Sequence, residues 1–223
     1  MDEMFEKFFK FRFFLSRMCY TKKNDAHGGK MLDPIQRSSG QRAVRLVLLF
    51  FFISFAGWCG ETVYFGIRYG VLADRGFLTS PLCPIYGFCL LGMAVGPGAP
   101  QTGLLQPLFI RAKGSRFPKA AAAGVYLLYF MIAALLPTAV EFVTAAYFDR
   151  ALGIRLWDYS YKRFDLFGYV SLDQAILWGL LITLAMQFVW PWLWQSSARI
   201  PAHAARIAAR LLLAWTACDL LFN

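Results

Sequence analysis

The stretch DRGFLTSPLCPIYGF, Asp74–Phe88, decides how the chain folds, because it separates two long apolar runs. Pro81 and Pro84 fix the backbone φ angle and bias the residues before them towards extended conformations. Neither helical nor strand periodicity runs through the stretch. A solvent-exposed loop would nevertheless rarely carry so many large apolar side chains. Two interpretations follow: a well-packed connector between membrane helices, or a re-entrant segment that lines a site. Non-helical backbone at membrane depth must be buried in protein or line a cavity.

The composition on either side of this stretch is that of a membrane protein. The 223 residues are 58% hydrophobic and 17% aromatic, which is too apolar for an ordinary soluble domain. Several apolar runs exceed the ~20 residues needed to cross about 30 Å of hydrocarbon. A transmembrane β-barrel would instead show short segments of alternating hydrophobicity. We therefore predict an all-α, polytopic helical membrane bundle.

Five apolar segments are predicted to cross the bilayer. They cover about residues 43–67, 83–110, 120–148, 170–194 and 202–222. The sequence GPGAP at Gly96–Pro100 is expected to break the second segment. The uncharged part of the last segment is short, so four spans with one tilted or partly submerged helix are the alternative. Residues 43–223 are thus predicted to form one transmembrane helical domain.

Residues 1–42 are predicted to form a separate cytoplasmic region. Within residues 1–20, apolar side chains recur at helical spacing beside an arc of basic ones. This pattern predicts an amphipathic helix that lies in the membrane interface or packs on the bundle. Residues 21–42 are polar and rich in Gly and Ser, and they are predicted to be a flexible linker.

The net charge of +10 indicates orientation rather than nucleic-acid binding. Seventeen of the 23 Lys and Arg residues fall in residues 1–45, Arg111–Lys119 and Arg199–Arg210. Because cytoplasmic loops of membrane proteins are enriched in basic residues, these segments are expected inside. The prediction is a multi-pass protein of the cell membrane with a cytoplasmic N-terminus, whose direct partner is the lipid bilayer.

This orientation places four acidic residues in the outer half of the bilayer: Glu61, Glu141, Asp173 and Asp219. An ionisable group at the bilayer centre costs about 2.5–3.5 kcal/mol and normally faces a partner or a watery cavity. Asp173 is explained by the N-terminal dipole of its helix, and Asp219 by an interfacial position near the end of the last segment.

Glu61 and Glu141 have two explanations. In the first, each carboxylate forms a structural ion pair with Arg75 or Arg155. In the second, the two carboxyl groups belong to a substrate or proton site. No cofactor or metal is expected, because the five Cys form no CxxC pair and the two His lack ligand spacing.

Several motifs in residues 44–222 carry a resemblance to a known family. They are FxGWxxE ending at Glu61, RGFLTSPLCPIYGF from Arg75, the acid Glu141, RLWDYS from Arg155, and LWG at Leu177–Gly179. In these motifs the chain resembles the ABC-transporter type IV family of CmpB-like permeases. The resemblance implies the membrane subunit of a transporter for an unknown solute or lipid, with a separate ATPase subunit as partner.

The candidate substrate-binding residues combine the motif residues with the outer acids: Glu61, Arg75, Tyr86, Glu141, Arg155, Trp157, Asp158, Tyr159 and Asp219. Two other functions stay open. The first is a membrane-embedded enzyme acting on lipid or cell-envelope material, with the acids supplying acid-base chemistry. The second is a structural or regulatory membrane protein whose acids only pair with arginines.

Overall fold

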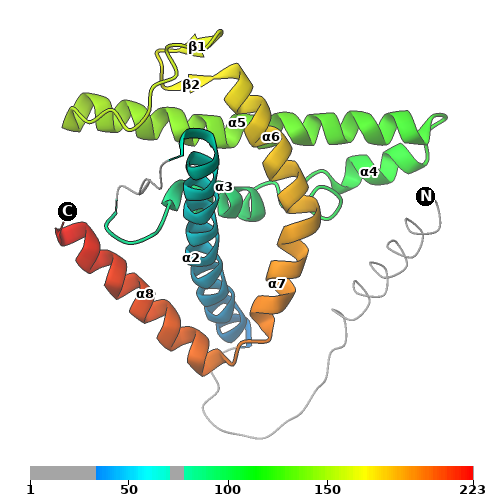
Figure 1. Ribbon diagram of the computed structural model, residues 1–223. Helices are drawn as coiled ribbons and strands as arrows, with labels where there is room; N and C mark the ends of the chain where they lie inside the picture. Colours follow the sequence, from blue (N-terminus) through cyan, green and yellow to red (C-terminus); the bar gives the residue numbers. More distant parts are fainter. Residues whose placement is uncertain (1–33, 71–77, 223) are drawn as a thin grey trace, which may run out of the picture. The chain divides into compact units, whose positions relative to one another are not determined.

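The computed structural model describes residues 34–70 and 78–222 (Figure 1). The predicted interfacial helix at 1–20 and the candidate Arg75 lie outside these residues. Residues 39–223 form one compact unit, and the contacts described below lie within it.

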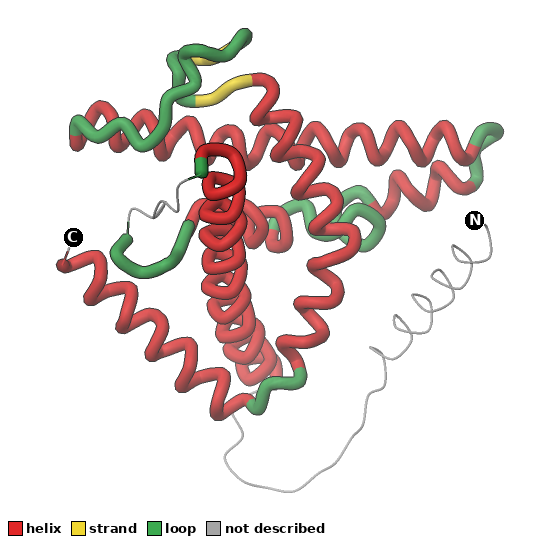
Figure 2. Tube along the Cα trace, in the orientation of Figure 1, coloured by secondary structure: helices red, strands yellow, loops and turns green. Residues whose placement is uncertain are grey.

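The described residues are mostly helical, with irregular connections and one short hairpin, so the all-α class is confirmed (Figure 2). In chain order the elements are α2 (Pro34–Tyr69), α3 (Pro84–Val95), α4 (Gln106–Lys113), α5 (Pro118–Leu152), β1 (Asp165–Leu166), β2 (Val170–Ser171), α6 (Leu172–Leu184), the π-helical turn η1 (Ala185–Val189), α7 (Trp190–Ala198) and α8 (Ala202–Phe222). The predicted linker is wrong over 34–42, because α2 begins at Pro34. Proline is favoured in the first turn of a helix, where its missing N–H has no helical partner.

Three helical segments are long and apolar enough to cross a membrane: Gly40–Tyr69, Pro118–Leu152 and Leu172–Ala198. They correspond to the first, third and fourth predicted spans, and they fit a membrane protein. The helix α3 is apolar but shorter than a span. The helix α8 covers the fifth predicted span without being among the three, so the structure supports three of the five predicted crossings.

The second predicted span is broken, as the GPGAP sequence indicated. Its first part, α3, ends at Val95, and α4 begins only at Gln106. The connection between them is tight: a Cβ added at Gly103 would lie 2.0 Å from the carbonyl oxygen of Pro97. Gly98 adopts a φ of 73°, which side chains other than glycine rarely accept. Glycine at both positions therefore lets the chain turn sharply between the two helices.

Hydrogen bonds attach this break to the neighbouring span, α5. The Tyr129 hydroxyl donates to the carbonyl oxygen of Gly98 at 2.7 Å. The Gln101 amide donates to the Tyr126 hydroxyl at 2.6 Å, and that hydroxyl donates to Gln187 Oε1 at 3.3 Å. Gln187 belongs to η1, a π-helical turn that was not predicted from the sequence. This turn lies between α6 and α7 and therefore interrupts the segment Leu172–Ala198. Turns of this kind occur often at functional sites.

The described part of the central stretch, residues 78–83, is irregular and packed. Leu78, Ser80 and Cys83 are buried, and the Cys83 N–H donates to the carbonyl oxygen of Ser54 in α2 at 3.0 Å. This packing is what the connector interpretation expected. The prediction that no helix runs through the stretch is wrong from Pro84 onward, because Pro84 opens α3.

The start of α2 is tied to the end of α7 by one arginine. Arg45 donates through Nε to Ser197 Oγ at 2.9 Å and through Nη2 to the carbonyl oxygen of Trp194. Its guanidinium lies 3.8 Å from the centre of the Trp194 ring. A guanidinium stacked on an indole adds cation–π attraction to these hydrogen bonds. Arg45 therefore joins two helices that are far apart in sequence.

After the long helix α5, an irregular loop leads into a hairpin that was not predicted from the sequence. Gly153 closes the helix in the left-handed conformation at φ 67°. The two-residue strands β1 and β2 then pair antiparallel, with Asp165 opposite Ser171. Because Val170 and Ser171 are in β2, α6 begins at Leu172 rather than at the predicted Val170.

Candidate functional site

The carboxyl group of Glu141 is the most deeply buried acid in the described residues of the three candidate spans. Its residue is 4% exposed in the middle of α5. The Tyr159 hydroxyl donates to Oε1 at 3.0 Å, and the Trp178 indole N–H donates to Oε2 at 3.2 Å. Tyr159 comes from the loop before β1 and Trp178 from α6. Three separate elements therefore fix one carboxyl group, which satisfies the requirement that a buried polar group be hydrogen-bonded.

Tyr159 links this carboxyl group to α6 a second time. Its hydroxyl accepts a hydrogen bond from the Gln174 amide at 3.1 Å. Burial raises the pKa of Tyr159, and the nearby carboxyl groups of Glu141 and Glu61 raise it further. The phenol therefore stays protonated at neutral pH and remains a hydrogen-bond donor.

Glu61 forms a second acid–phenol pair beside the first. The Tyr86 hydroxyl donates to Glu61 Oε1 at 2.9 Å. The ring of Tyr86 lies so close to Gly57 that a Cβ there would meet it at 2.5 Å. Gly57 and Glu61 are four residues apart and share one face of α2. The ring thus rests on Gly57 while its hydroxyl reaches Glu61.

The two acid–phenol pairs meet at Trp178. The rings of Tyr86 and Trp178 have centroids 5.1 Å apart, and the same indole donates to Glu141. The structure therefore brings together four residues of the predicted helical and hairpin motifs: Glu61, Tyr86, Glu141 and Tyr159. We call these four with Gln174 and Trp178 the acid–phenol cluster. Its acceptors and donors suit a ligand that carries hydrogen-bond donors or positive charge.

Three other predicted site residues shape the loop before β1 instead of entering the cluster. Arg155 Nη2 lies 2.9 Å from Asp158 Oδ1, and both side chains are nearly half exposed. Trp157 donates through its indole to the carbonyl oxygen of Tyr169 at 2.8 Å. The Tyr159 N–H donates to the carbonyl oxygen of Gly168 at 2.9 Å. These contacts hold Tyr159 in position above Glu141.

The ion pair considered between Glu141 and Arg155 is not formed. Glu141 is bonded to a phenol and an indole, and Arg155 pairs with Asp158, three residues along. Gly168 makes this close pair possible at φ 72°, because a Cβ there would meet Arg155 Nη2 at 2.3 Å. The exposed pair contributes little by itself, but it shapes the turn that presents Tyr159.

Replacement of Asp158 by asparagine should remove a pH-dependent contribution to stability. The Ser160 backbone N–H, followed by the Arg155 guanidinium, holds the pKa of Asp158 below its usual value. A carboxyl group with a lowered pKa stabilises the fold above its unfolded pKa of ~3.9 and loses that effect as the pH falls through the folded value. The difference in melting temperature between wild type and Asp158→Asn should stay constant from about pH 8 to 5 and shrink below about pH 4. A difference that widens in acid would contradict this account.

The remaining acids bind elsewhere in the described residues. Asp219 in α8 accepts hydrogen bonds from the backbone N–H groups of Thr79 and Ser80, at 3.2 and 2.9 Å, and from the Ser80 hydroxyl. It therefore fastens the last helix to the central stretch. Asp173, in the first turn of α6, lies 2.5 Å from the Lys162 ammonium.

Gln174 and Trp178 were missed as candidate site residues. Their spacing of four residues places both on one face of α6. A polar amide and an indole on one face of an otherwise apolar span were the signal that could have identified them. Gly179, next to Trp178, permits the close approach, since a Cβ there would lie 2.7 Å from the Phe130 ring of α5. Among residues 34–70 and 78–222, no group of three His, Cys, Asp or Glu side chains is arranged to hold a metal ion.

Comparison with known proteins gives one match. The model of a family described as "Putative ABC-transporter type IV" matches residues 48–223. No curated protein and no solved structure matches the chain. The matched range includes every member of the acid–phenol cluster and ends beyond α8.

Proposed function

Because the chain belongs to the ABC-transporter type IV family, we propose that it is a permease subunit whose ATPase is a separate protein. In this proposal the acid–phenol cluster is the polar site through which a solute passes or is sensed. The observation that carries the proposal is the buried carboxyl group of Glu141, held by two donors within a helix long enough to span the membrane. An ionisable side chain in a membrane span is costly and is therefore typical of a substrate or ion pathway.

The broken second span supports the same function. In many transporters, binding sites form where a membrane helix is interrupted. Here the interruption between α3 and α4 and the π-helical turn η1 meet at Tyr126 of α5. The acid–phenol cluster lies further along α5, at Glu141. Two irregular helices beside the same span provide the kind of elements that change conformation during transport.

Along their own helices, the two acids also lie at similar distances from the C-terminal end. At a rise of 1.5 Å per residue, Glu141 lies roughly 16 Å from the end of α5 and Glu61 roughly 12 Å from the end of α2. A solute with hydrogen-bond donors or positive charge is the best match to two carboxyl groups. Each phenol that now donates to a carboxyl group would turn away as the solute replaces it.

Cross-linking in the native membrane tests this function. The tagged chain is cross-linked before extraction, and the captured proteins are assayed for ATP hydrolysis. We expect one ATP-hydrolysing partner, and we expect Glu141→Gln to change the hydrolysis rate of the reconstituted complex. Trp192→Phe is the matched control, because Trp192 is 62% exposed and outside the cluster. Absence of an ATP-hydrolysing partner, or equal rates for wild type and Glu141→Gln, would reject the permease assignment.

A further inference from the structure

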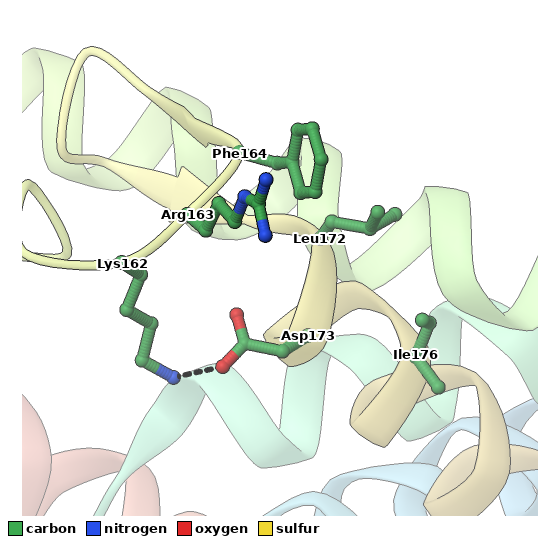
Figure 3. Close-up of a pocket in the computed structure, with 6 residues that line it drawn as sticks. All are labelled: Lys162, Arg163, Phe164, Leu172, Asp173 and Ile176. Carbon is green, nitrogen blue, oxygen red and sulfur yellow. Dashed lines mark hydrogen bonds and ion pairs between the residues drawn. The ribbon is translucent and has the colours of Figure 1, made fainter.

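An open hollow lies between the loop before β1 and the start of α6, beside the acid–phenol cluster. Its volume is about 340 Å³, and Lys162, Arg163, Phe164, Leu172, Asp173 and Ile176 line it. Figure 3 shows these six side chains around the hollow, with the ion pair between Lys162 and Asp173 as a dashed line. Two segments that are distinct in sequence, the loop before β1 and the first turns of α6, therefore form its walls.

The polar part of the hollow carries an excess of positive charge. Lys162 pairs with Asp173 at 2.5 Å and also reaches Gln174 Oε1 at 3.4 Å. The Arg163 guanidinium lies 5.6 Å from the centre of the Phe164 ring. In the part of the chain that the structure describes, Arg163 forms no ion pair or side-chain hydrogen bond. With two cations and one acid, the hollow has a guanidinium available for an anion.

The apolar part of the hollow continues along the membrane helix. Leu172, Ile176, Leu180 and Leu184 follow one another at intervals of four and are each 46–52% exposed. Residues at this spacing lie on one face of a helix. The segment Leu172–Ala198 is long and apolar enough to span the membrane, so we expect this exposed stripe to face lipid. A cationic hollow thus opens at the end of a lipid-facing stripe.

We propose that this hollow binds the phosphate of one anionic phospholipid, whose acyl chain lies along the stripe. The Arg163 guanidinium donates to the phosphate oxygens, a pairing that its planar fork favours. Lys162 adds positive charge, and Asp173 competes with the phosphate for it. Basic hollows beside membrane helices are suited to acidic lipid head groups. The inference does not depend on the permease assignment, because the hollow contains none of the four predicted site residues in the cluster.

Native mass spectrometry of the full chain released from detergent measures this binding. The chain is titrated with phosphatidylglycerol, with zwitterionic phosphatidylcholine, and with inorganic phosphate. We expect the first phosphatidylglycerol to bind about tenfold more tightly than phosphatidylcholine, as one charge-assisted contact allows. Arg163→Ala should remove most of that preference. Equal binding of both lipids, or binding of inorganic phosphate as tight as that of phosphatidylglycerol, would overturn the proposal.

Two further variants separate lipid binding from loss of structure. Asp173→Asn removes the competing carboxylate, so it should tighten phosphatidylglycerol binding several-fold and phosphatidylcholine binding less, because the choline cation opposes the gain. Arg116→Ala is the matched control, because Arg116 also lies 5.6 Å from the ring of the phenylalanine that follows it but does not line the hollow. An equal loss of lipid preference in Arg116→Ala and Arg163→Ala would attribute the effect to general surface charge and reject the site.

Discussion

Replacement of Glu141 by glutamine is expected to lower the free energy of unfolding by about 1–3 kcal/mol, the cost of a buried polar group without a partner. The carboxyl group receives one hydrogen bond at each oxygen, from Tyr159 and from Trp178. Glutamine keeps one acceptor oxygen but presents an amide N–H₂ in place of the other. One of the two donors therefore faces another donor, and the residue is too deeply buried for water to compensate.

A double-mutant cycle with Trp178→Phe identifies the contact responsible. Phenylalanine removes the indole N–H, so the cost of Glu141→Gln should fall by about 1 kcal/mol in that background. The measurement is unfolding of the detergent-solubilised chain by a denaturing detergent. Trp192→Phe, at an exposed indole of α7, should leave the cost of Glu141→Gln unchanged. Strict additivity of Glu141→Gln and Trp178→Phe would contradict the hydrogen bond as the source of stability.

The membrane spans could be predicted because they depend on length and apolar content. The runs that include Leu49, Ala133 and Ile182 are long enough to cross a bilayer whatever their neighbours are. The break at GPGAP could also be predicted, since proline and glycine act on the local backbone. The approach of Glu61 and Glu141 followed from topology, because both acids lie late in helices that were expected to run in the same direction.

The partners of these acids could not be predicted, because they depend on how the helices cross. The sequence offered Arg155 as a partner for Glu141, but the structure places one phenol and one indole against that carboxyl group. A phenol also donates to Glu61, whose predicted partner Arg75 lies outside the described residues. Those contacts require the close approach of α3 to Gly57 and of α5 to Gly179. The charges in the sequence do not reveal at which glycines two helices approach each other closely.

The hairpin was missed because its backbone opposes local preference. Phe164 and Phe167 adopt φ angles of 63° and 56°, where bulky side chains are rarely found. Hydrogen bonds from other parts of the loop hold this conformation, including one from the Gly168 N–H to Asp165 Oδ2 at 2.8 Å. A propensity argument assigns such residues to a loop. Only the pairing of β1 with β2 identifies the turn at residues 167–169, whose Gly168 carbonyl oxygen accepts a hydrogen bond from the Tyr159 N–H.

Replacement of Gly57 by alanine is expected to destabilise the chain by about 1–3 kcal/mol, the usual cost of overpacking. The added Cβ would lie 2.5 Å from two ring atoms of Tyr86 and 2.9 Å from its Cβ. The ring cannot move freely, because its hydroxyl is bonded to Glu61 and its face lies against Trp178. Gly60→Ala is the matched control on the same helix, since no heavy atom lies within 4 Å of a Cβ there. That control should raise stability by up to about 1 kcal/mol, because alanine has the higher helix propensity.

The opposite changes in stability expected for alanine at Gly57 and at Gly60 test how closely α2 and α3 approach each other. Combining Gly57→Ala with Tyr86→Ala removes the ring that the new methyl group meets, so the added cost should largely disappear. If Gly57→Ala destabilised the Tyr86→Ala chain as much as the wild type, the clash would arise elsewhere. If Gly57→Ala stabilised the wild type as Gly60→Ala does, the close contact between Gly57 and Tyr86 would be wrong. A Tyr86 ring displaced by the new methyl group would also alter the candidate site, because it would no longer donate to Glu61 or contact Trp178. Gly57 therefore determines both how closely two helices approach and whether the two acid–phenol pairs form one cluster.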